Sequence, residues 1–181
     1  MSLITNDYEA FLFVKDHLLT QNAKAMSDSD DCQYRGYSDI TLNAVREEAY
    51  RLAKEQVEDW VDTEDLQCDL FYDILPTKNC DAMCAVGCLI LDQFYESNME
   101  GEAIDGNDYV LEAVIQSNPA WKVTEKSFHM LKKLQKIHDG MTVETWESAL
   151  SVIGESFDQY NDYDPNYFSE LEKAQKEKEN D

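Results

Sequence analysis

The chain has 181 residues, of which 38 are acidic and 15 basic, so its formal net charge is −23. This length suits one domain that buries a real core, and a hydrophobic content of 43% argues against wholesale disorder. The negative charge argues against direct binding to nucleic acid or membrane, because non-specific binding to either requires Lys and Arg beside phosphates. The expected partner is therefore a cationic protein.

The expected compartment is the cytoplasm. No stretch of the sequence approaches the roughly 18 consecutive apolar residues that span a membrane, and no basic region precedes an apolar run near residue 1. The five cysteines are an odd number, so they cannot all pair with one another. A reducing compartment would keep them as free thiols.

Helical periodicity dominates the sequence from its beginning. A capping-box spacing at Asn6 and Glu9 precedes apolar residues at intervals of three and four, which predicts a helix over 6–22. Residues 25–38 follow with the composition of turns and no period, which predicts a loop.

The middle of the chain contains the clearest amphipathic pattern. Ser38 or Asp39 can cap a helix whose apolar stripe extends to Trp60. Residues 80–91 are a nearly continuous apolar run that approaches helical length without enrichment in β-branched residues. This run predicts a central buried helix.

Three further helices are predicted after a loop around residues 101–107. The first covers 109–116, the second begins at Thr124 and is closed by Gly140 in the usual position after a C-terminus, and the third follows Thr142. Each has apolar residues at helical intervals.

The end of the sequence is polar. Asp164 and Pro165 have the spacing of an N-cap and a first helical turn, which predicts a last, polar helix that frays in the tail. The whole pattern predicts an all-α fold: a single compact helical domain of about six to eight helices over 1–163, with the polar helix and frayed tail over 164–181.

Acidic residues are clustered in the sequence, and two runs contain no basic residue. The first run is Glu58, Asp59, Asp62, Glu64, Asp65, Asp69 and Asp73. The second run is Asp92, Glu96, Glu100, Glu102, Asp105, Asp108 and Glu112. Basic residues are segregated too, with five lysines between Lys122 and Lys136.

The two acidic runs are the candidate partner-binding residues. Clustered carboxylates repel one another and oppose folding, so their presence indicates a use. A helix can place acids one turn, about 5.4 Å, apart, which approximates a row of phosphates and would make the protein a DNA mimic. The alternative is that these acidic faces are simply solvated.

The cysteines and histidines offer a second kind of site. Cys80, Cys84 and Cys88 recur every four residues, and Cys32 or Cys68 could complete four zinc ligands. Structural zinc normally uses paired ligands separated by a longer spacer, and the intervening residues are apolar, so we expect these cysteines in the core and predict no metal and no cofactor.

A cysteine–histidine nucleophile is the remaining catalytic alternative. Cys32 or Cys84 could pair with His138, which ends a helix where the dipole favours an imidazolium. The sequence contains no phosphate-binding glycine motif, nucleophile elbow or dinucleotide fingerprint. We therefore assign no catalytic residue and expect that the protein is not an enzyme.

Three short blocks carry a resemblance to a known family. They are Cys-Gln-Tyr-Arg-Gly over 32–36, Cys-Ala-Val-Gly-Cys-Leu-Ile over 84–90 with Tyr95 and Met-Glu-Gly over 99–101 downstream, and Leu-Gln-Lys-Ile-His-Asp-Gly over 134–140. In this order they resemble a family of small uncharacterised proteins of tailed bacteriophages and prophages. In that family a short loop joins the first two blocks, so the resemblance implies that residues 37–83 and the C-terminal acidic helix are additions to a common core.

The resemblance implies a phage-encoded protein that acts in the cytoplasm of the bacterial host. Small acidic phage proteins are often inhibitors of host nucleases or defence complexes. We therefore predict an accessory, anti-defence protein that binds and inhibits a basic host protein, one that handles nucleic acid or acts in defence. The alternative is a small metal-binding protein or enzyme built around Cys32, Cys84, Cys88 and His138.

Overall fold

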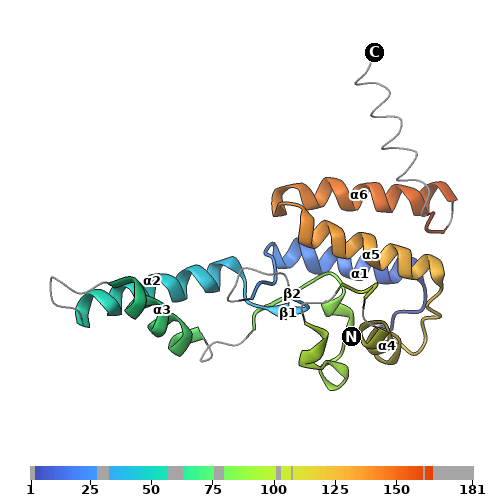
Figure 1. The fold of residues 1–181 in the computed structure, drawn as a ribbon. Helices are drawn as coiled ribbons and strands as arrows, with labels where there is room; N and C mark the ends of the chain where they lie inside the picture. Colours follow the sequence, from blue (N-terminus) through green and yellow to red (C-terminus); the bar gives the residue numbers. More distant parts are fainter. Residues whose placement is uncertain are drawn as a thin grey trace, which may run out of the picture.

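The structure is a computed structural model that describes residues 3–27, 33–56, 63–75, 80–100, 103–106, 108–160 and 162–164. The fold is all-α, as predicted. The described residues contain α1 (Asp7–Gln21), α2 (Asp39–Gln56), α3 (Thr63–Ile74), α4 (Asp108–Ser117), α5 (Glu125–Gly140) and α6 (Val143–Tyr160), with strands β1 (Arg35–Gly36) and β2 (Ala82–Met83). Figure 1 shows these elements divided between a main body and a projecting pair of helices.

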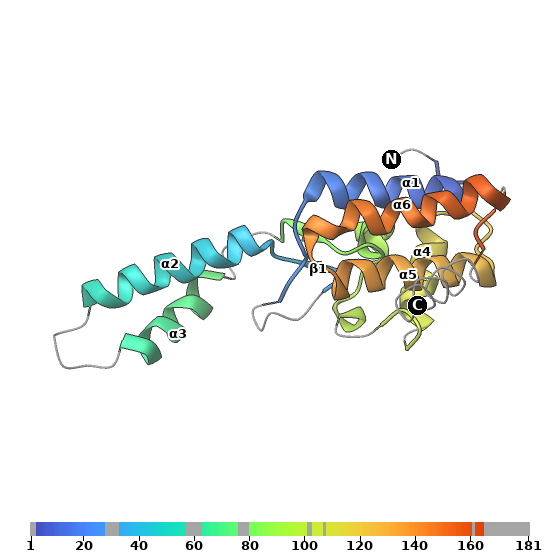
Figure 2. The same cartoon turned by 90° about the horizontal axis from the view of Figure 1, so that it is seen from above.

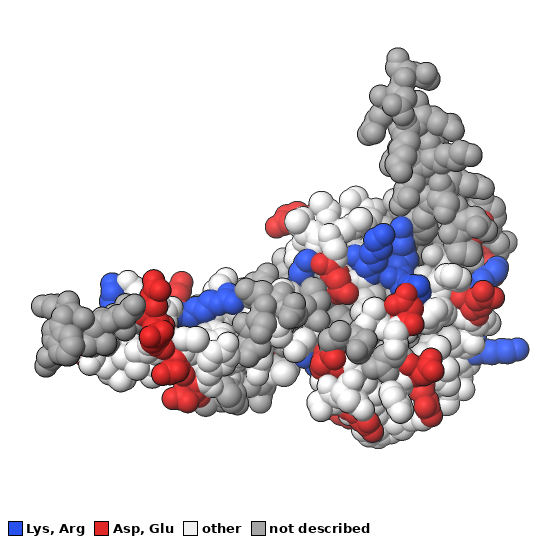
Figure 3. Space-filling view, in the orientation of Figure 1, with Lys and Arg blue, Asp and Glu red and all other residues white. Residues whose placement is uncertain are grey.

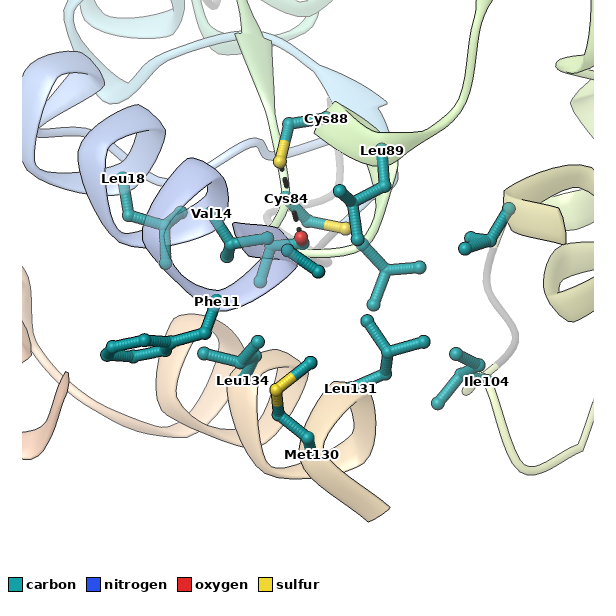
Figure 4. Close-up of a cluster of buried hydrophobic side chains, with 14 of the residues drawn as sticks. Phe11, Val14, Leu18, Cys84, Cys88, Leu89, Ile104, Met130, Leu131 and Leu134 are labelled. Atoms are coloured by element: carbon teal, nitrogen blue, oxygen red, sulfur yellow. Dashed lines mark hydrogen bonds between the residues drawn. The ribbon is translucent and has the colours of Figure 1, made fainter. Parts of the chain in front are cut away.

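The main body is built on α1, α5 and α6, which lie side by side (Figures 1 and 2). Below them lie α4 and three single 3-10 turns, η2 (Gly87–Leu89), η3 (Asp92–Phe94) and η4 (Ser97–Met99). The core between these layers is made of aliphatic and aromatic side chains, and Phe11, Leu18, Leu131, Leu134 and Trp146 are fully buried in it. Figure 4 shows part of this cluster.

The helices of the body begin where the sequence predicts. The side chain of Asn6 accepts a hydrogen bond from the backbone N–H of Glu9 at 2.9 Å and so caps α1. At α5 the cap is reciprocal: Ser127 N–H donates to Thr124 Oγ1, and Thr124 N–H donates to Ser127 Oγ. Asn22 ends α1 in the left-handed conformation with φ of 49°.

The second part of the molecule is the α2–α3 hairpin. Its two antiparallel helices project from the body like an arm (Figures 1 and 2). They share a small cluster of their own, made of Leu42, Val45 and Ala49 on α2, Phe71 on α3 and Leu75 directly after α3. The expected single domain therefore has two hydrophobic clusters instead of one.

The hairpin leaves the body between the two strands. Arg35 lies opposite Met83 and Gly36 opposite Ala82 in an antiparallel pair, and a separate bridge joins Met26 to Tyr37. The two ends of the hairpin are therefore held side by side where they join the body. The hairpin lies within 37–83, the segment that the resemblance marks as an addition.

One predicted helix is wrong. Residues 80–91 are buried in large part, as expected, but they form β2, a turn and η2. The cause is a tertiary contact: Cys84 N–H donates to the Tyr34 carbonyl at 3.0 Å, and a Cβ on Gly87 would lie 2.0 Å from that same oxygen. Pairing with a distant strand outweighs the local tendency of an apolar run to be helical.

Two smaller differences concern an unexpected helix and a helix end. Helix α3 was not expected, because its acids concealed the apolar spacing of Leu66, Leu70 and Ile74. Gly140 does not follow α5 but is its last residue, and Met141 caps the helix with an extended backbone. Trp60 and the helix predicted after Asp164 lie outside the described residues, so the boundary at 164 stays a prediction.

Candidate partner-binding surface

The outward face of α3 is acidic. Asp65, Asp69 and Asp73 are exposed and four residues apart, which places them on successive turns about 6 Å apart. The opposite face of α3 contributes Phe71 to the hairpin cluster. Figure 3 shows acidic side chains across this hairpin.

The three aspartates of α3 have no ion pair among the residues that the structure describes. The cations of α2 are engaged elsewhere. Arg51 pairs with Glu55 at 2.7 Å, Lys54 lies over the Tyr50 ring and Arg46 over the Phe71 ring. The negative charge of this face is therefore directed to solvent.

Only one other member of the first acidic run lies among the described residues. Glu64 is also exposed on α3, in its first turn, where the helix dipole stabilises a negative charge. Glu58, Asp59 and Asp62 lie outside the described residues. We name the described part of this run, Glu64, Asp65, Asp69 and Asp73, the α3 acidic face.

The second acidic run is divided between internal contacts and solvent. Asp92 pairs with Arg35 at 2.6 Å, and Asp105 pairs with Lys132 at 2.6 Å. The hydrogen bond from Lys132 lowers the pKa of Asp105. Both carboxylates thus offset charges of the same molecule.

Glu100 has a structural role. Its carboxylate accepts the backbone N–H groups of Tyr34 and Arg35 at 2.7 and 3.0 Å, and the Tyr95 hydroxyl at 2.6 Å. Burial, and then this hydrogen bond, raise the pKa of Tyr95, so the hydroxyl stays a donor. Glu100 therefore joins β1 to the segment after η4 and is not available to a partner.

The other described members of the second run are exposed. Glu96, Asp108 and Glu112 lie on the surface of the body, and Glu102 lies outside the described residues. Figures 1 and 2 place α4 in the body and α3 in the projecting hairpin. The two runs thus occupy different parts of the molecule and do not make one continuous described surface.

The lysines of α5 form a basic group on the body (Figure 3). Lys126 pairs with Asp162 at 2.5 Å, and this hydrogen bond raises the pKa of the ammonium. Lys132 pairs with Asp105 and also lies over the Phe128 ring. Much of this positive charge is therefore balanced within the molecule, which leaves the surface predominantly acidic.

The cysteines do not form a stripe. Cys84 and Cys88 are buried in the core, whereas Cys68 and Cys80 are exposed, and Cys32 lies outside the described residues. Cys84 accepts the Gly87 N–H, and Cys88 donates to the Ala85 carbonyl, the bond drawn in Figure 4. Burial raises the pKa of both thiols, which opposes formation of the reactive thiolate.

His138 is a core residue. Its side chain is fully buried and stacks on Trp146 with ring centroids 5.3 Å apart. Nε2 accepts the Ala25 N–H at 3.3 Å and Nδ1 lies 2.7 Å from Asp139, an arrangement that suits the neutral ring with its proton on Nδ1. His138 therefore serves packing and hydrogen bonding inside the body.

No described group of three or more His, Cys, Asp or Glu side chains is arranged to hold a metal ion. The described contacts of Cys84 likewise do not include His138. The chemistry of the described residues thus gives no specific support to the catalytic or metal-binding alternative.

The blocks that carry the resemblance come together in the structure. The Tyr34 carbonyl accepts from Cys84, its hydroxyl accepts from Gln135 at 3.5 Å, and its N–H donates to Glu100. Gly87 packs against the same residue. The described residues Tyr34, Cys84, Gly87 and Glu100 of these blocks therefore meet at a junction inside the body, and this convergence was not visible from the sequence alone.

Comparison with models of protein families, with curated proteins and with solved structures finds no match. None of the described helices has both the length and the apolar character needed to cross a membrane. The described surface, above all the α3 acidic face, is therefore the basis for a functional assignment.

Proposed function

We propose that this protein is a non-enzymatic, phage-encoded accessory protein that binds a basic protein of the bacterial host and inhibits it. The α3 acidic face is the docking surface. The body holds the hairpin, and the hairpin presents the carboxylates to the partner. The partner is a nucleic-acid-handling or defence protein in the host cytoplasm, because such proteins carry the basic surfaces that these carboxylates complement.

The observation that supports this proposal is the unequal use of the two acidic runs. In the body, Asp92, Glu100 and Asp105 are held by contacts inside the molecule. On α3, Asp65 and Asp69 point to solvent without a described ion pair. Carboxylates that make no internal contact and repel one another are stabilised most when a cationic partner binds.

Charge complementarity, and not full imitation of DNA, is the mechanism that we favour. Helix α3 has 12 residues, about 18 Å, and so covers roughly five base pairs at 3.4 Å each. Its carboxylates, about 6 Å apart, are also sparser than duplex phosphates. A DNA mimic would need further acidic rows in line with this one.

The proposal is tested by reversing the charge of the α3 acidic face. Asp65, Asp69 and Asp73 are replaced together by lysine, and the tagged protein is used to capture host proteins from bacterial lysate at low and high salt. We expect the triple variant to bind its partner at least about tenfold more weakly, a change of roughly 1.4 kcal/mol, mainly through slower association.

The matched control changes the same net charge on the body. Glu96, Asp108 and Glu112 are replaced together by lysine, and this variant should retain the partner. Equal loss in both variants would show that total charge, and not the α3 face, attracts the partner. A partner retained by the α3 variant and lost by the body variant would overturn the proposal.

A further inference from the structure

A groove of about 570 Å³ lies between the C-terminal half of α1 and the base of the hairpin. One wall is α1, with Phe13, Asp16 and His17. The other wall is the start of α2 and the strand β2, with Ile40, Asp81 and Met83. The groove therefore lies where the hairpin joins the body.

We propose that this groove is a second docking site, which takes a short segment of a partner protein that carries an arginine or lysine beside aliphatic side chains. The inference rests on the proposed function for the sign of the partner's charge, and it adds the place where an apolar anchor of that partner would bind.

The charges around the groove favour a cation. Asp16 and Asp81 are both exposed carboxylates on its walls. The last turn of α1, which borders the groove through Thr20 and Gln21, has no basic residue to balance its carbonyl dipoles. The N-terminus of α2, the positive end of its dipole, already has a negative partner. Asp81 accepts hydrogen bonds from the N–H and the hydroxyl of Ser38, both at 2.8 Å.

The third titratable side chain of the groove does not oppose a cation. Burial lowers the pKa of His17, so the ring is neutral near pH 7. Its Nε2 lies 3.2 Å from the Met83 carbonyl, to which the neutral ring can donate. The charged groups that line the groove are therefore the two carboxylates.

The apolar part of the groove is unusually exposed. Ile40 has 78% of its surface exposed, although it lies in the first turn of α2 beside the body. Phe13 and Met83 are partly buried and line the same space. An aliphatic side chain that lies against these three residues would remove apolar surface from water, which is the main favourable term in association.

The walls are held in place before any partner binds. Gln21 donates to the Met83 carbonyl at 3.0 Å and accepts the Met83 N–H at 2.8 Å, so α1 and β2 are joined across the floor. Asp81 fixes the start of α2 in the same region. A preformed groove lowers the ordering cost of binding.

The experiment uses the full chain labelled with ¹⁵N and a synthetic peptide of alternating leucine and arginine. Amide shifts are followed as the peptide is added. We expect saturable changes centred on Phe13, His17 and Ile40. Peptides in which glutamate replaces arginine, or serine replaces leucine, should bind about tenfold more weakly or worse.

Two single substitutions test the two halves of the groove, each with a matched control. Ile40→Ser should weaken peptide binding about fivefold by removing apolar contact, whereas Ile115→Ser, at an exposed isoleucine of α4, should not. Asp16→Asn should weaken it about threefold by removing charge, whereas Asp158→Asn on α6 should not.

Shifts that spread over α3 and α4 without saturation, or an Ile40→Ser variant that binds the peptide as the wild type does, would overturn this site. The two proposals fail separately. If the α3 lysine variant loses the host partner while Ile40→Ser keeps both partner and peptide, the groove is wrong and the α3 face stands. If the peptide binds the groove while the α3 lysine variant keeps its partner, the α3 face is wrong.

Discussion

The body and the hairpin are both mainly helical, but they are held together by different kinds of packing. The body buries large side chains from many segments distant in sequence, including Phe11, Leu89, Leu134 and Trp146. The hairpin buries five residues of moderate size between two helices that are neighbours in the chain. Stability thus resides in the body, and the hairpin is the part able to open locally, as interaction elements often do.

This difference explains where the acids are used. In the body, a carboxylate such as Glu100 can be enclosed by donors from several segments. A two-helix hairpin encloses nothing on its outer side, so Asp65 and Asp69 stay in water. The same residue type is structural in one region and presented to solvent in the other.

The largest effect is expected from truncation in the body. Trp146→Ala removes a fully buried ring stacked on His138 and should lower the free energy of unfolding by about 3–5 kcal/mol. Urea denaturation followed by circular dichroism measures it, and the hairpin should lose its structure no later than the body.

A conservative variant separates the ring from its polar atom. The Trp146 Nε1 is buried without a partner among the described residues, and an unsatisfied buried donor costs about 1–3 kcal/mol. Trp146→Phe removes that atom while keeping an aromatic ring, so it should cost clearly less than alanine. Equal losses for both variants would contradict this assignment.

The next effect should be confined to the hairpin. Phe71→Ala removes the largest side chain of the small cluster and should cost the hairpin about 3 kcal/mol, less if the helices close over the space. Hydrogen exchange should then show α2 and α3 losing protection while α1, α5 and α6 keep theirs. Uniform loss across both regions would show that they form one cooperative unit.

A smaller effect is expected where the two regions join. Asp81 accepts hydrogen bonds from Ser38 and Thr41, and Ser38 Oγ in turn accepts the Thr41 N–H at the start of α2. Asp81→Ala should destabilise the hairpin by about 1 kcal/mol, the usual value of a helix cap. Exchange of the first amides of α2 measures it, and Asp73→Ala on α3 is the control.

The same contact gives a pH dependence. Partial burial opposes the shift, but the hydrogen bonds from Ser38 and Thr41 prevail and lower the pKa of Asp81 below its ordinary value of 3.8. The contribution is therefore complete above that value and is lost as pH falls through the lower pKa of the folded state. Protection at the start of α2 should fall in this acid range in the wild type and change less in Asp81→Ala.

The sequence predicts the parts of this molecule that depend on neighbours in the chain. The caps at Asn6, Thr124 and Ser38 and the helices that follow them could be read directly, because capping and helical spacing are local. Helix α3 has the same kind of signal in the helical spacing of Leu66 and Leu70, but the acidic residues around them mask this apolar pattern.

The parts that could not be predicted depend on contacts between distant segments. Gly87 adopts its turn because the Tyr34 backbone lies against it, and no local pattern indicates that approach. In the same way, Glu100 and Asp65 have the same acidic surroundings in sequence, and only the fold shows that one is enclosed by β1 and the other is not. The partner-binding role of the acidic runs stays a prediction, and the fold separates the carboxylates with internal contacts from those exposed to solvent.

The smallest expected effect concerns the stability of the α3 acidic face itself. Asp69 lies one turn from both Asp65 and Asp73, and like charges at this spacing destabilise a helix by about 0.2–0.5 kcal/mol per pair. Asp69→Asn removes both repulsions and should raise hairpin stability by about 0.5 kcal/mol at low salt, a gain that screening should abolish at high salt. Hydrogen exchange of α2 and α3 at the two salt concentrations measures it, with Asp158→Asn on α6 as the control. A loss of stability in Asp69→Asn would mean that this carboxylate serves a contact within the molecule, and the α3 acidic face would then have the same structural use as Glu100 in the body.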